Sequence, residues 1–418
     1  MAEAFSAASS AVQAEPVDPA RRIGSIDVLR GFALLGILVM NIQSFSMPDA
    51  AYLNPSAYGD LTGANRWVWI VSHLFTDQKM MGIFSMLFGA GILLMSNRVE
   101  ERRQQPGPLH YRRMAWLILF GLLHGHLLWS GDILWFYGVG GLVVYLFRKR
   151  SPKTLAASAV IFFAIGSALF ALLGYYVRSL PPDQLQAFAE QNWSPTPETI
   201  KDEIATFRGG WLRQMPIRSS EAFFMETFVF LLFMGWKTIG NMLLGMALYK
   251  WGVIAGACSR SRYGRMVVAG LVIGLPIVTV GIWKNFAANW DVRYSMFFGS
   301  QYNYWGAIAV DLGLIGAIML AATSQKPTRL TTSLGAVGRM AFTNYIMQTV
   351  FCSLIFYGNG FGLFGAVSRV EQILIVVAIW ILQVPISAWW LRRFKYGLLE
   401  WLWRSLTYSR RMPLAVAA

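Results

Sequence analysis

The stretch from Phe75 to Gly91, FTDQKMMGIFSMLFGAG, decides the fold because it joins charged residues to an apolar helix rich in small residues. It begins with Asp77 and Lys79 and continues as an apolar run with glycines and a serine. An ionisable group remains in hydrocarbon when it is paired or faces a cavity, and small residues let another backbone or a ligand approach. The alternative is an interfacial start, with Lys79 extending its ammonium group to the lipid headgroups.

The composition agrees with a membrane environment for the whole chain. Of the 418 residues, 56% are hydrophobic and 14% are charged, and the mean hydropathy is +0.46. Apolar runs of about 20 residues, long enough to cross a bilayer, recur along the sequence. The predicted fold class is therefore all-α, a polytopic helical membrane protein.

The apolar runs predict ten spanning helices, with both termini in the cytoplasm. Of the 36 Lys and Arg residues, 24 fall in the tails and loops on that side, and the positive-inside rule explains this bias. It also explains the net charge of +15, so no nucleic-acid partner is expected. The predicted helices are 26–47, 67–96, 113–129, 132–147, 154–177, 221–250, 264–283, 302–323, 336–357 and 371–390.

The remaining segments flank or connect these helices. Residues 1–20 are rich in Ala and Ser and predict a disordered tail, before a transmembrane helical domain over 21–390. Residues 391–418 alternate basic and aromatic residues, which predicts an amphipathic cytoplasmic segment on anionic lipid. The outer segment 179–217 has room for a short amphipathic helix.

Two His/Asp pairs are candidates for general-base chemistry, because a carboxylate orients an imidazole and stabilises its charged form. His73 and Asp77 are four residues apart, on one face of a continuous helix. His124 and Asp132 flank a short turn and are able to meet across a hairpin. The alternatives are an interfacial hydrogen bond for the first pair and a helix N-cap for Asp132.

Other polar residues within the predicted spans are candidates for substrate binding or a charge relay. Asp27 and Arg30 are three apart and can touch across a helical turn. Glu226 and Lys237 are about three turns apart, so each needs another partner, and Asp311 is the candidate for Lys237. No metal-ligand cluster is present, so no metal is expected. The full set of relay candidates is Asp27, Arg30, Lys79, Glu226, Lys237, Asn241, Asp311 and Asn344.

A short internal echo suggests a structural repeat. The pattern M-L-x-G occurs at Met86–Gly89 and again at Met242–Gly245, and Lys79 and Lys237 precede the two copies. Both helices run from outside to inside in the predicted topology. This favours a parallel repeat related by an axis along the membrane normal.

Several longer motifs together resemble the YeiB-like family, known as domain of unknown function 418. The resemblance runs in order over nearly the whole chain and implies a multi-pass protein of the bacterial inner membrane. The motifs are RIGSIDVLRGFALLGILVMNI (22–42), FSMLFGAG (84–91), RRMAWLILFGLLHGHLLWSGDIL (112–134), GRMAFTNYIMQTV (338–350), FYGNGFGLFG (356–365) and EWLWRSLTY (400–408).

A more distant resemblance carries a functional hypothesis. The D-x-x-R-G sequence at Asp27 to Gly31, with the helix from Asp77 to Gly91, resembles transmembrane acyltransferases of the heparan-glucosaminide acetyltransferase type. In those enzymes the catalytic histidine precedes the Asp by more residues than His73 does here. The resemblance implies acyl-CoA as the donor, and a small-molecule or lipid-linked acceptor among membrane lipids. His124 or His73 would be the base, and the phosphates would meet arginines at positions 98, 102, 112 and 113.

Two other classes of function fit the same sequence. A transporter or lipid-handling protein would use Glu226, Lys237 and Asp311 as an ion or proton relay. A structural or regulatory membrane protein would need no chemistry.

Overall fold

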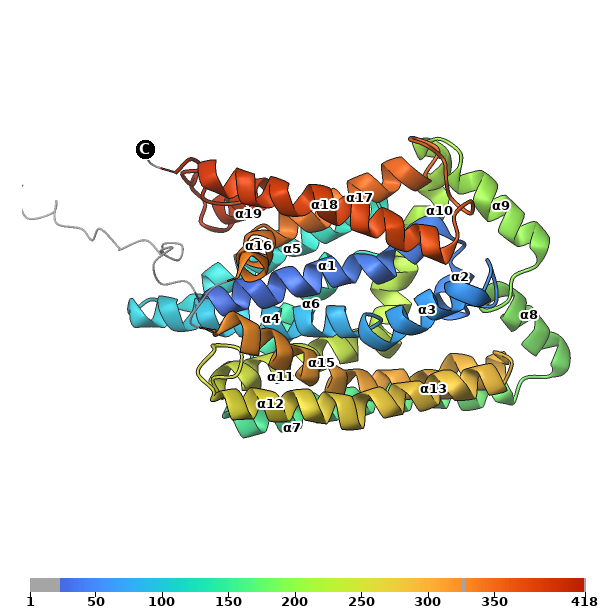
Figure 1. The fold of residues 1–418 in the computed structure, drawn as a ribbon, viewed down its shortest axis with the longest axis horizontal. Coiled ribbons are helices and arrows are strands. Elements are labelled where there is room, and N and C mark those ends of the chain that lie inside the picture. Colours follow the sequence, from blue (N-terminus) through green and yellow to red (C-terminus); the bar gives the residue numbers. More distant parts are fainter. Residues whose placement is uncertain (1–22, 325–327, 417–418) are drawn as a thin grey trace, which may run out of the picture.

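The computed structural model describes residues 23–324 and 328–416, which form an elongated helical bundle (Figure 1). Among these residues β-structure is limited to one isolated bridge, between Phe394 and Ala415. The predicted tail, residues 1–20, lies outside the described residues. The helices are α1 (Gly24–Ser46), α2 (Ala50–Leu53), α3 (Gly63–Phe75), α4 (Lys79–Glu101), α5 (Pro106–Leu127), α6 (Leu134–Tyr145), α7 (Pro152–Arg178), α8 (Pro182–Asn192), α9 (Pro197–Phe207), α10 (Trp211–Phe224), α11 (Gly235–Lys250), α12 (Arg260–Ala269), α13 (Leu275–Ala287), α14 (Val292–Tyr294), α15 (Ser300–Ala322), α16 (Arg329–Arg339), α17 (Ala341–Phe356), α18 (Arg369–Arg393) and α19 (Leu398–Thr407), with π-helical segments Met225–Met234, Gly270–Gly274 and Ser295–Gly299.

The prediction of an all-α, multi-pass membrane protein is confirmed. Within the described ranges, seven helical segments are long and apolar enough to cross a bilayer. Helices α6 and α17 are apolar but shorter, and α5 covers another predicted span. The count of ten crossings stays a prediction. The seven segments are Gly24–Ser46, Gly63–Glu101, Pro152–Arg178, Trp211–Lys250, Arg260–Ala287, Val292–Ala322 and Arg369–Arg393.

The predicted helix 67–96 is broken in the stretch that decides the fold. Helix α3 ends at Phe75, and α4 begins at Lys79. The Thr76 hydroxyl donates to the Ser72 carbonyl at 2.6 Å, and Gln78 has the left-handed φ of 62°. A left-handed residue redirects the chain after a helix end. The break therefore separates two helices and leaves Asp77 in an irregular turn.

The predicted helix 336–357 is also two helices, so its expected boundary was wrong. Helices α16 and α17 meet at Met340, and α16 packs across α1. A Cβ added at Gly31 would lie 2.0 Å from the Leu334 carbonyl oxygen, and one added at Gly338 would lie 1.9 Å from the Asp27 carbonyl oxygen. Two backbones meet here without intervening side chains, which an apolar run alone does not reveal.

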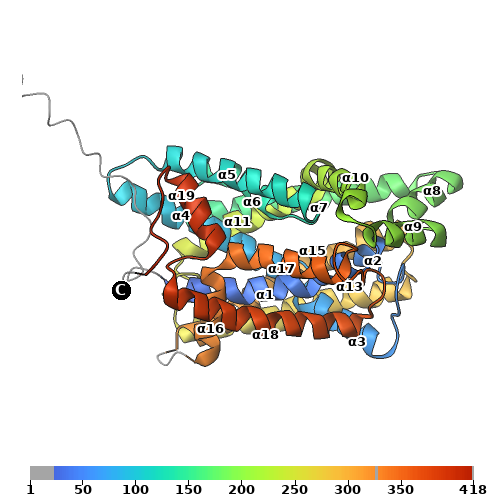
Figure 2. The same ribbon diagram turned by 90° about the horizontal axis from the view of Figure 1, so that it is seen from above.

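The outer segment folds into two short helices rather than the single amphipathic helix expected. Helices α8 and α9 lie at one end of the bundle, and α19 lies at the other (Figures 1 and 2). We call α8 and α9 the outer cap; Trp193, which follows α8, and Phe207, the last residue of α9, are buried. By the predicted topology, the end with α8 and α9 is the outer end, and the end with α19 is the inner end.

The two M-L-x-G motifs pack against each other where α4 crosses α11. A Cβ at Gly89 would lie 2.1 Å from the Met242 carbonyl oxygen, and a Cβ at Gly245 would lie 1.9 Å from the Met86 carbonyl oxygen. Each motif therefore places its glycine against the methionine that begins the other motif. A local two-fold axis would produce such reciprocal contacts, and the internal repeat stays a prediction.

We expect Gly89→Ala to destabilise the protein by about 1–3 kcal/mol, because the added methyl group collides with backbone that cannot rotate away. Gly91→Ala, on the same helix, is the matched control because a Cβ there has nothing within 4 Å. Chemical unfolding of both variants in detergent measures the difference. Equal stability of the two variants would contradict the close crossing.

The C-terminal segment contains the expected amphipathic helix, α19, which packs against α5 and the start of α17. The Glu400 carboxylate accepts the backbone N–H groups of Phe342 and Thr343 at 2.6 and 3.1 Å, and so satisfies two free donors at the start of α17. The Arg113 guanidinium lies 4.5 Å from the Trp403 ring centroid. These contacts fix α19 at the inner end.

Candidate active site

His73 and Asp77 meet at the break between α3 and α4. His73 Nδ1 lies 3.0 Å from Asp77 Oδ2, and 17% of the His73 side chain is exposed. The imidazole stacks on Trp69 with ring centroids 4.8 Å apart. Within residues 23–324 and 328–416, Nε2 has no hydrogen-bond partner. With Nδ1–H donated to the carboxylate, Nε2 presents a lone pair, which is the arrangement of a general base.

Lys79 is fully buried beside this pair, with 0% of its surface exposed. Its ammonium group donates to the His73 carbonyl oxygen at 2.7 Å and to Asn303 Oδ1. Asn303 Nδ2 donates in turn to Asp77 Oδ2 at 2.7 Å. Of the two interpretations of Lys79, the structure therefore has the paired lysine and not the snorkelling one.

Lys237 lies next to this group, and its hydrogen bonds go to residues at and beyond the helix break. Its ammonium group donates to Gln78 Oε1 and, at 3.1 Å, to the Tyr304 carbonyl oxygen. It also lies 4.4 Å from the Tyr304 ring centroid. The candidate partner Asp311 interacts with Lys237 electrostatically, without a direct hydrogen bond between the two side chains.

Asp311 and Asn241 lie on either side of Gly82, in the same region of the bundle. Both side chains are buried, and none of their side-chain N and O atoms has a hydrogen-bond partner among the described residues. Among residues 23–324 and 328–416, no group of three or more His, Cys, Asp and Glu residues is arranged to hold a metal ion.

The second predicted pair also forms, across the hairpin between α5 and α6. His124 Nδ1 lies 2.7 Å from Asp132 Oδ1, and Nε2 lies 3.0 Å from the Thr349 hydroxyl. Asp132 Oδ2 accepts the Trp135 backbone N–H at 2.7 Å, which satisfies one free donor of α6, although the N-cap residue of that helix is Ile133. Only 2% of the His124 side chain is exposed. This Asp–His–Thr chain is closed, with both imidazole nitrogens engaged.

Glu226 finds its partner on α5, as its distance from Lys237 along the chain requires. Its Oε2 lies 3.3 Å from His126 Nε2, and His126 Nδ1 lies 2.8 Å from the Ser219 hydroxyl. This contact joins α5 to the segment Trp211–Lys250 near the outer end of the His124 hairpin.

The other relay candidates lie apart from these groups. Arg30 Nη1 lies 3.0 Å from Asp27 Oδ1, which confirms the expected contact across one turn of α1. Asn344 Nδ2 donates to the Ser387 hydroxyl at 2.9 Å, and the Asn344 carbonyl accepts from Gln383 at 2.8 Å. Asn344 thus joins α17 to α18, a role that requires no substrate.

The sequence did not single out three residues that complete these groups. Asn303 and Gln78 accept from the two buried lysines, and Thr349 contacts His124. The one sequence feature that could have identified these residues is that each is polar and lies within or beside an apolar span. Each partner is more than 150 residues away along the chain, so sequence spacing does not pair them.

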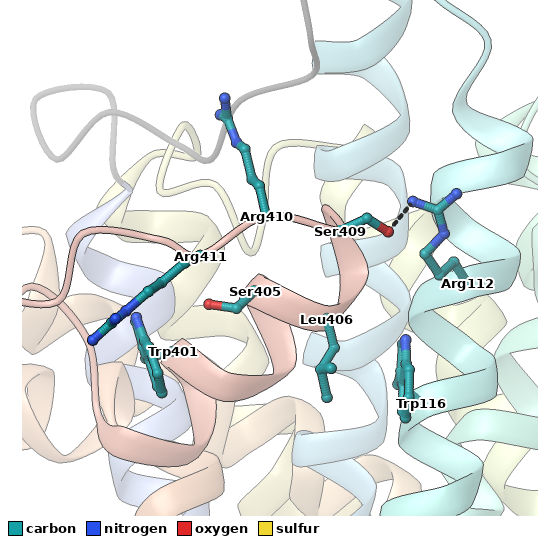
Figure 3. A pocket seen from close by; sticks show the side chains of 8 residues that line it. All are labelled: Arg112, Trp116, Trp401, Ser405, Leu406, Ser409, Arg410 and Arg411. Carbon is teal, nitrogen blue, oxygen red and sulfur yellow. Dashed lines mark hydrogen bonds between the residues drawn. The ribbon is translucent and has the colours of Figure 1, made fainter.

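An open groove lies between α5 and α19 at the inner end (Figure 3). Its volume is about 660 Å³, and Arg112 on its wall donates to the Ser409 hydroxyl at 2.8 Å. Of the four arginines expected to meet phosphates, Arg112 is the one that lines this groove. The lining residues are Arg112, Trp116, Trp401, Ser405, Leu406, Ser409, Arg410 and Arg411.

A carboxyl group in the outer cap predicts that the stability of the protein depends on pH. Glu203 on α9 accepts the Asp49 backbone N–H at 2.9 Å. Burial, together with the nearby Asp49 carboxylate, raises the pKa of Glu203 from 4.5 to about 7. Such a group binds its proton more tightly in the folded state. Its stabilising contribution is therefore complete below pH 4.5 and is lost as the pH rises through about 7.

We therefore expect the unfolding temperature to fall as the pH rises from 4.5 to about 7, and Glu203→Gln to remove part of that fall. The neighbouring exposed residue provides the control, Asp202→Asn. Thermal unfolding of the three proteins across this pH range measures the effect. Identical pH profiles for Glu203→Gln and the wild type would contradict it.

Comparison with known proteins gives relatives along nearly the whole chain. The family model described as "Protein of unknown function (DUF418)" matches residues 248–410. "Uncharacterized protein YeiB" of Escherichia coli (strain K12) is 31% identical over 395 residues, covering 93% of this chain and 97% of that protein. "Uncharacterized protein YxaH" of Bacillus subtilis (strain 168) is 31% identical over 424 residues, covering 96% and 98%. An "Uncharacterized 39.9 kDa protein in amylase 3'region" of Bacillus acidopullulyticus is 26% identical over 407 residues.

Proposed function

The chain belongs to the YeiB-like (DUF418) family of membrane proteins, and we propose that it is a membrane acyltransferase. It would move an acyl group from cytoplasmic acyl-CoA to an extracytoplasmic or lipid-linked acceptor, in the inner membrane. The observation that carries this proposal is the His73–Asp77 pair, whose Nε2 atom is unpartnered among the described residues and whose side chains are partly exposed.

In the proposed reaction, one proton moves to His73 in the first step and from His73 in the second. The lone pair of His73 Nε2 accepts the proton of an acceptor hydroxyl or amine as that group attacks the thioester carbonyl carbon. Asp77 stabilises the imidazolium that forms, and Asn303 holds the carboxylate in place. When the tetrahedral intermediate collapses, the carbon–sulfur bond breaks and the thiolate leaves with the proton from Nε2.

His73 suits this role better than His124 does. Both nitrogens of His124 already have partners, and its side chain is enclosed. A base must come within hydrogen-bond reach of the proton that it takes. His124 would have to release Thr349 first, whereas Nε2 of His73 needs no such release.

The groove at the inner end suits the nucleotide part of acyl-CoA. Arginine forks match phosphate oxygens, and indole rings offer flat faces for stacking. Arg112, Arg411, Trp116 and Trp401 supply both features at the predicted cytoplasmic end (Figure 3). Helix α4 extends about 34 Å from Lys79 to Glu101, so the acyl group would have to cross that depth to reach His73.

A second candidate, a carrier or lipid-handling protein, is favoured by a different observation. Lys79, Lys237 and Asp311 are ionisable groups buried within the bundle, and such groups commonly line ion or proton paths in transporters. Membrane lipids would be partners in either case.

The test is acyl transfer by the purified protein in lipid. Labelled acetyl-CoA and longer acyl-CoAs are supplied with an extract of membrane lipids and sugars. We expect label on a product with the wild type and its loss with His73→Ala. A wild type that transfers no label from any of the donors, while remaining folded, would overturn the enzyme in favour of the carrier.

A further inference from the structure

Four buried polar atoms without partners belong to two side chains beside Gly82. They are both carboxylate oxygens of Asp311 and the side-chain O and N of Asn241, and no described residue bonds to any of them. A Cβ added at Gly82 would lie 2.2 Å from Asp311 Oδ2 and 3.5 Å from Asn241 Nδ2. The two side chains therefore converge on the small surface that the glycine leaves.

Such a group is rare in folded proteins, because a buried polar atom without a partner loses its hydration and gains nothing. A buried carboxylate without a donor is especially unfavourable. The position also lies within a segment that is long and apolar enough to cross a bilayer, Val292–Ala322. Asp311 lies eleven residues from either end of α15 (Ser300–Ala322), about 16 Å from each.

The charged groups around Asp311 decide which occupant fits. Lys79 on α4 and Lys237 on α11 both interact electrostatically with its carboxylate, yet their hydrogen bonds within the described residues go elsewhere. Each ammonium group has three donors and uses two, so one N–H on each remains. The other nearby carboxylate, Asp77, is already bonded to His73 and Asn303.

We propose that Asp311, Asn241 and the two lysines enclose a buried hydration site, at which Asp311 takes up and releases a proton through water. Water supplies donors to the carboxylate and both donor and acceptor to the amide. Two ammonium groups disfavour a metal cation in the same space, and the carboxylate disfavours an anion. The proposal deepens the charge relay of the carrier candidate and does not require acyl transfer at His73, although Lys79 contacts both groups.

The proton is exchanged with solution through water. In one state the Lys237 ammonium and the Asp311 carboxylate are both charged. In the other, a proton from solution has passed through water to a carboxylate oxygen, which leaves a neutral acid beside the two ammonium groups. No bond other than O–H forms or breaks. The exchange changes the charge of a buried group within an apolar span, as proton relays require.

Infrared spectroscopy of the purified protein in lipid tests the proposal through the C=O stretch of a protonated carboxylic acid. We expect one component of the carboxylic-acid absorption to grow as the pH falls, to shift in heavy water and to be absent from Asp311→Asn, while the component from Glu203 remains. The control is Asp27→Asn, because the Asp27 carboxylate is paired with Arg30 outside this site. Lys237→Gln should raise the pH at which the band appears, because it removes a nearby positive charge.

A pair of glycine variants tests whether the Asp311 carboxyl group lies against Gly82. A Cβ at Gly82 would lie 2.2 Å from Asp311 Oδ2, so Gly82→Ala forces the carboxyl group to move and should shift the frequency of the band. The matched variant, Gly91→Ala, lies on the same helix with nothing within 4 Å of its Cβ and should leave the band as in the wild type.

Three outcomes would overturn the proposal. The first is a wild type without a carboxylic-acid band that changes with pH, a result that requires no variant to fold. The second is a band unchanged by Asp311→Asn. The third is a spectrum that responds to sodium and not to pH, which would indicate a cation site. None of them depends on the acyl-transfer assay, so the two proposals fail separately.

Discussion

Replacing His73 with alanine is expected to lower the rate of acyl transfer by about 10²–10⁴-fold, the usual contribution of a positioned general base. The variant should remain folded, because the imidazole is partly exposed and its hydrogen bond to Asp77 is one of two that the carboxylate accepts. The Lys79 ammonium contacts the backbone of His73, and that contact survives truncation of the side chain. The initial rate at saturating acyl-CoA measures the effect.

Two variants make this prediction specific. His126→Ala removes another partly exposed histidine at the outer end and should leave the rate within a few fold of the wild type. Asp77→Asn keeps a side chain of similar shape but cannot stabilise the imidazolium, so it should lower the rate by a large part of the His73→Ala effect. A His73→Ala protein that transfers label at the wild-type rate would exclude His73 as the base.

The overall architecture was predictable because the membrane imposes a simple length requirement. Each of the ten predicted ranges contains helix in the structure, and the positions follow from apolar runs of about 20 residues. The positions of the breaks were not predictable in the same way. Gln78 stands between two charged residues and Met340 lies within a predicted span, and neither is the glycine or proline that usually marks an interruption.

The candidate site was predictable where its contacts are local. His73 with Asp77, His124 with Asp132, and Asp27 with Arg30 are eight residues apart or fewer, and all three pairs are in contact. A helical turn or a tight hairpin brings such residues together whatever the rest of the fold does.

Long-range partners required the packing of the whole bundle. Asp311 was the candidate partner of Lys237, but the hydrogen bonds of Lys237 go to Gln78 and to the backbone of Tyr304. The break before α4 places the Gln78 side chain within reach of Lys237. The length of the predicted helix 67–96 allowed a break but did not place it, so the partner was not predicted.

Replacing Asp132 with alanine should have the largest effect on stability, a loss of about 3–5 kcal/mol, because it removes the acceptor of two buried hydrogen bonds. Each carboxylate oxygen has a short contact, with His124 Nδ1 at 2.7 Å and with the Trp135 N–H at 2.7 Å. Both donors would be left buried without acceptors. Asp132→Asn retains an acceptor and should lose less. Chemical unfolding in detergent, compared with Asp202→Ala at an exposed position, measures the difference.

This prediction also separates the two His/Asp pairs by function. If His124 and Asp132 hold the α5–α6 hairpin against α17, then Thr349→Val should also destabilise the protein, because Thr349 is the far end of the same chain. Acyl transfer by the folded fraction of either variant should stay near the wild-type rate. The opposite pattern, unchanged stability with transfer abolished in Asp132→Ala, would place the base at His124. The closed Asp–His–Thr chain would then have to open during the reaction, since both imidazole nitrogens are engaged when it is closed.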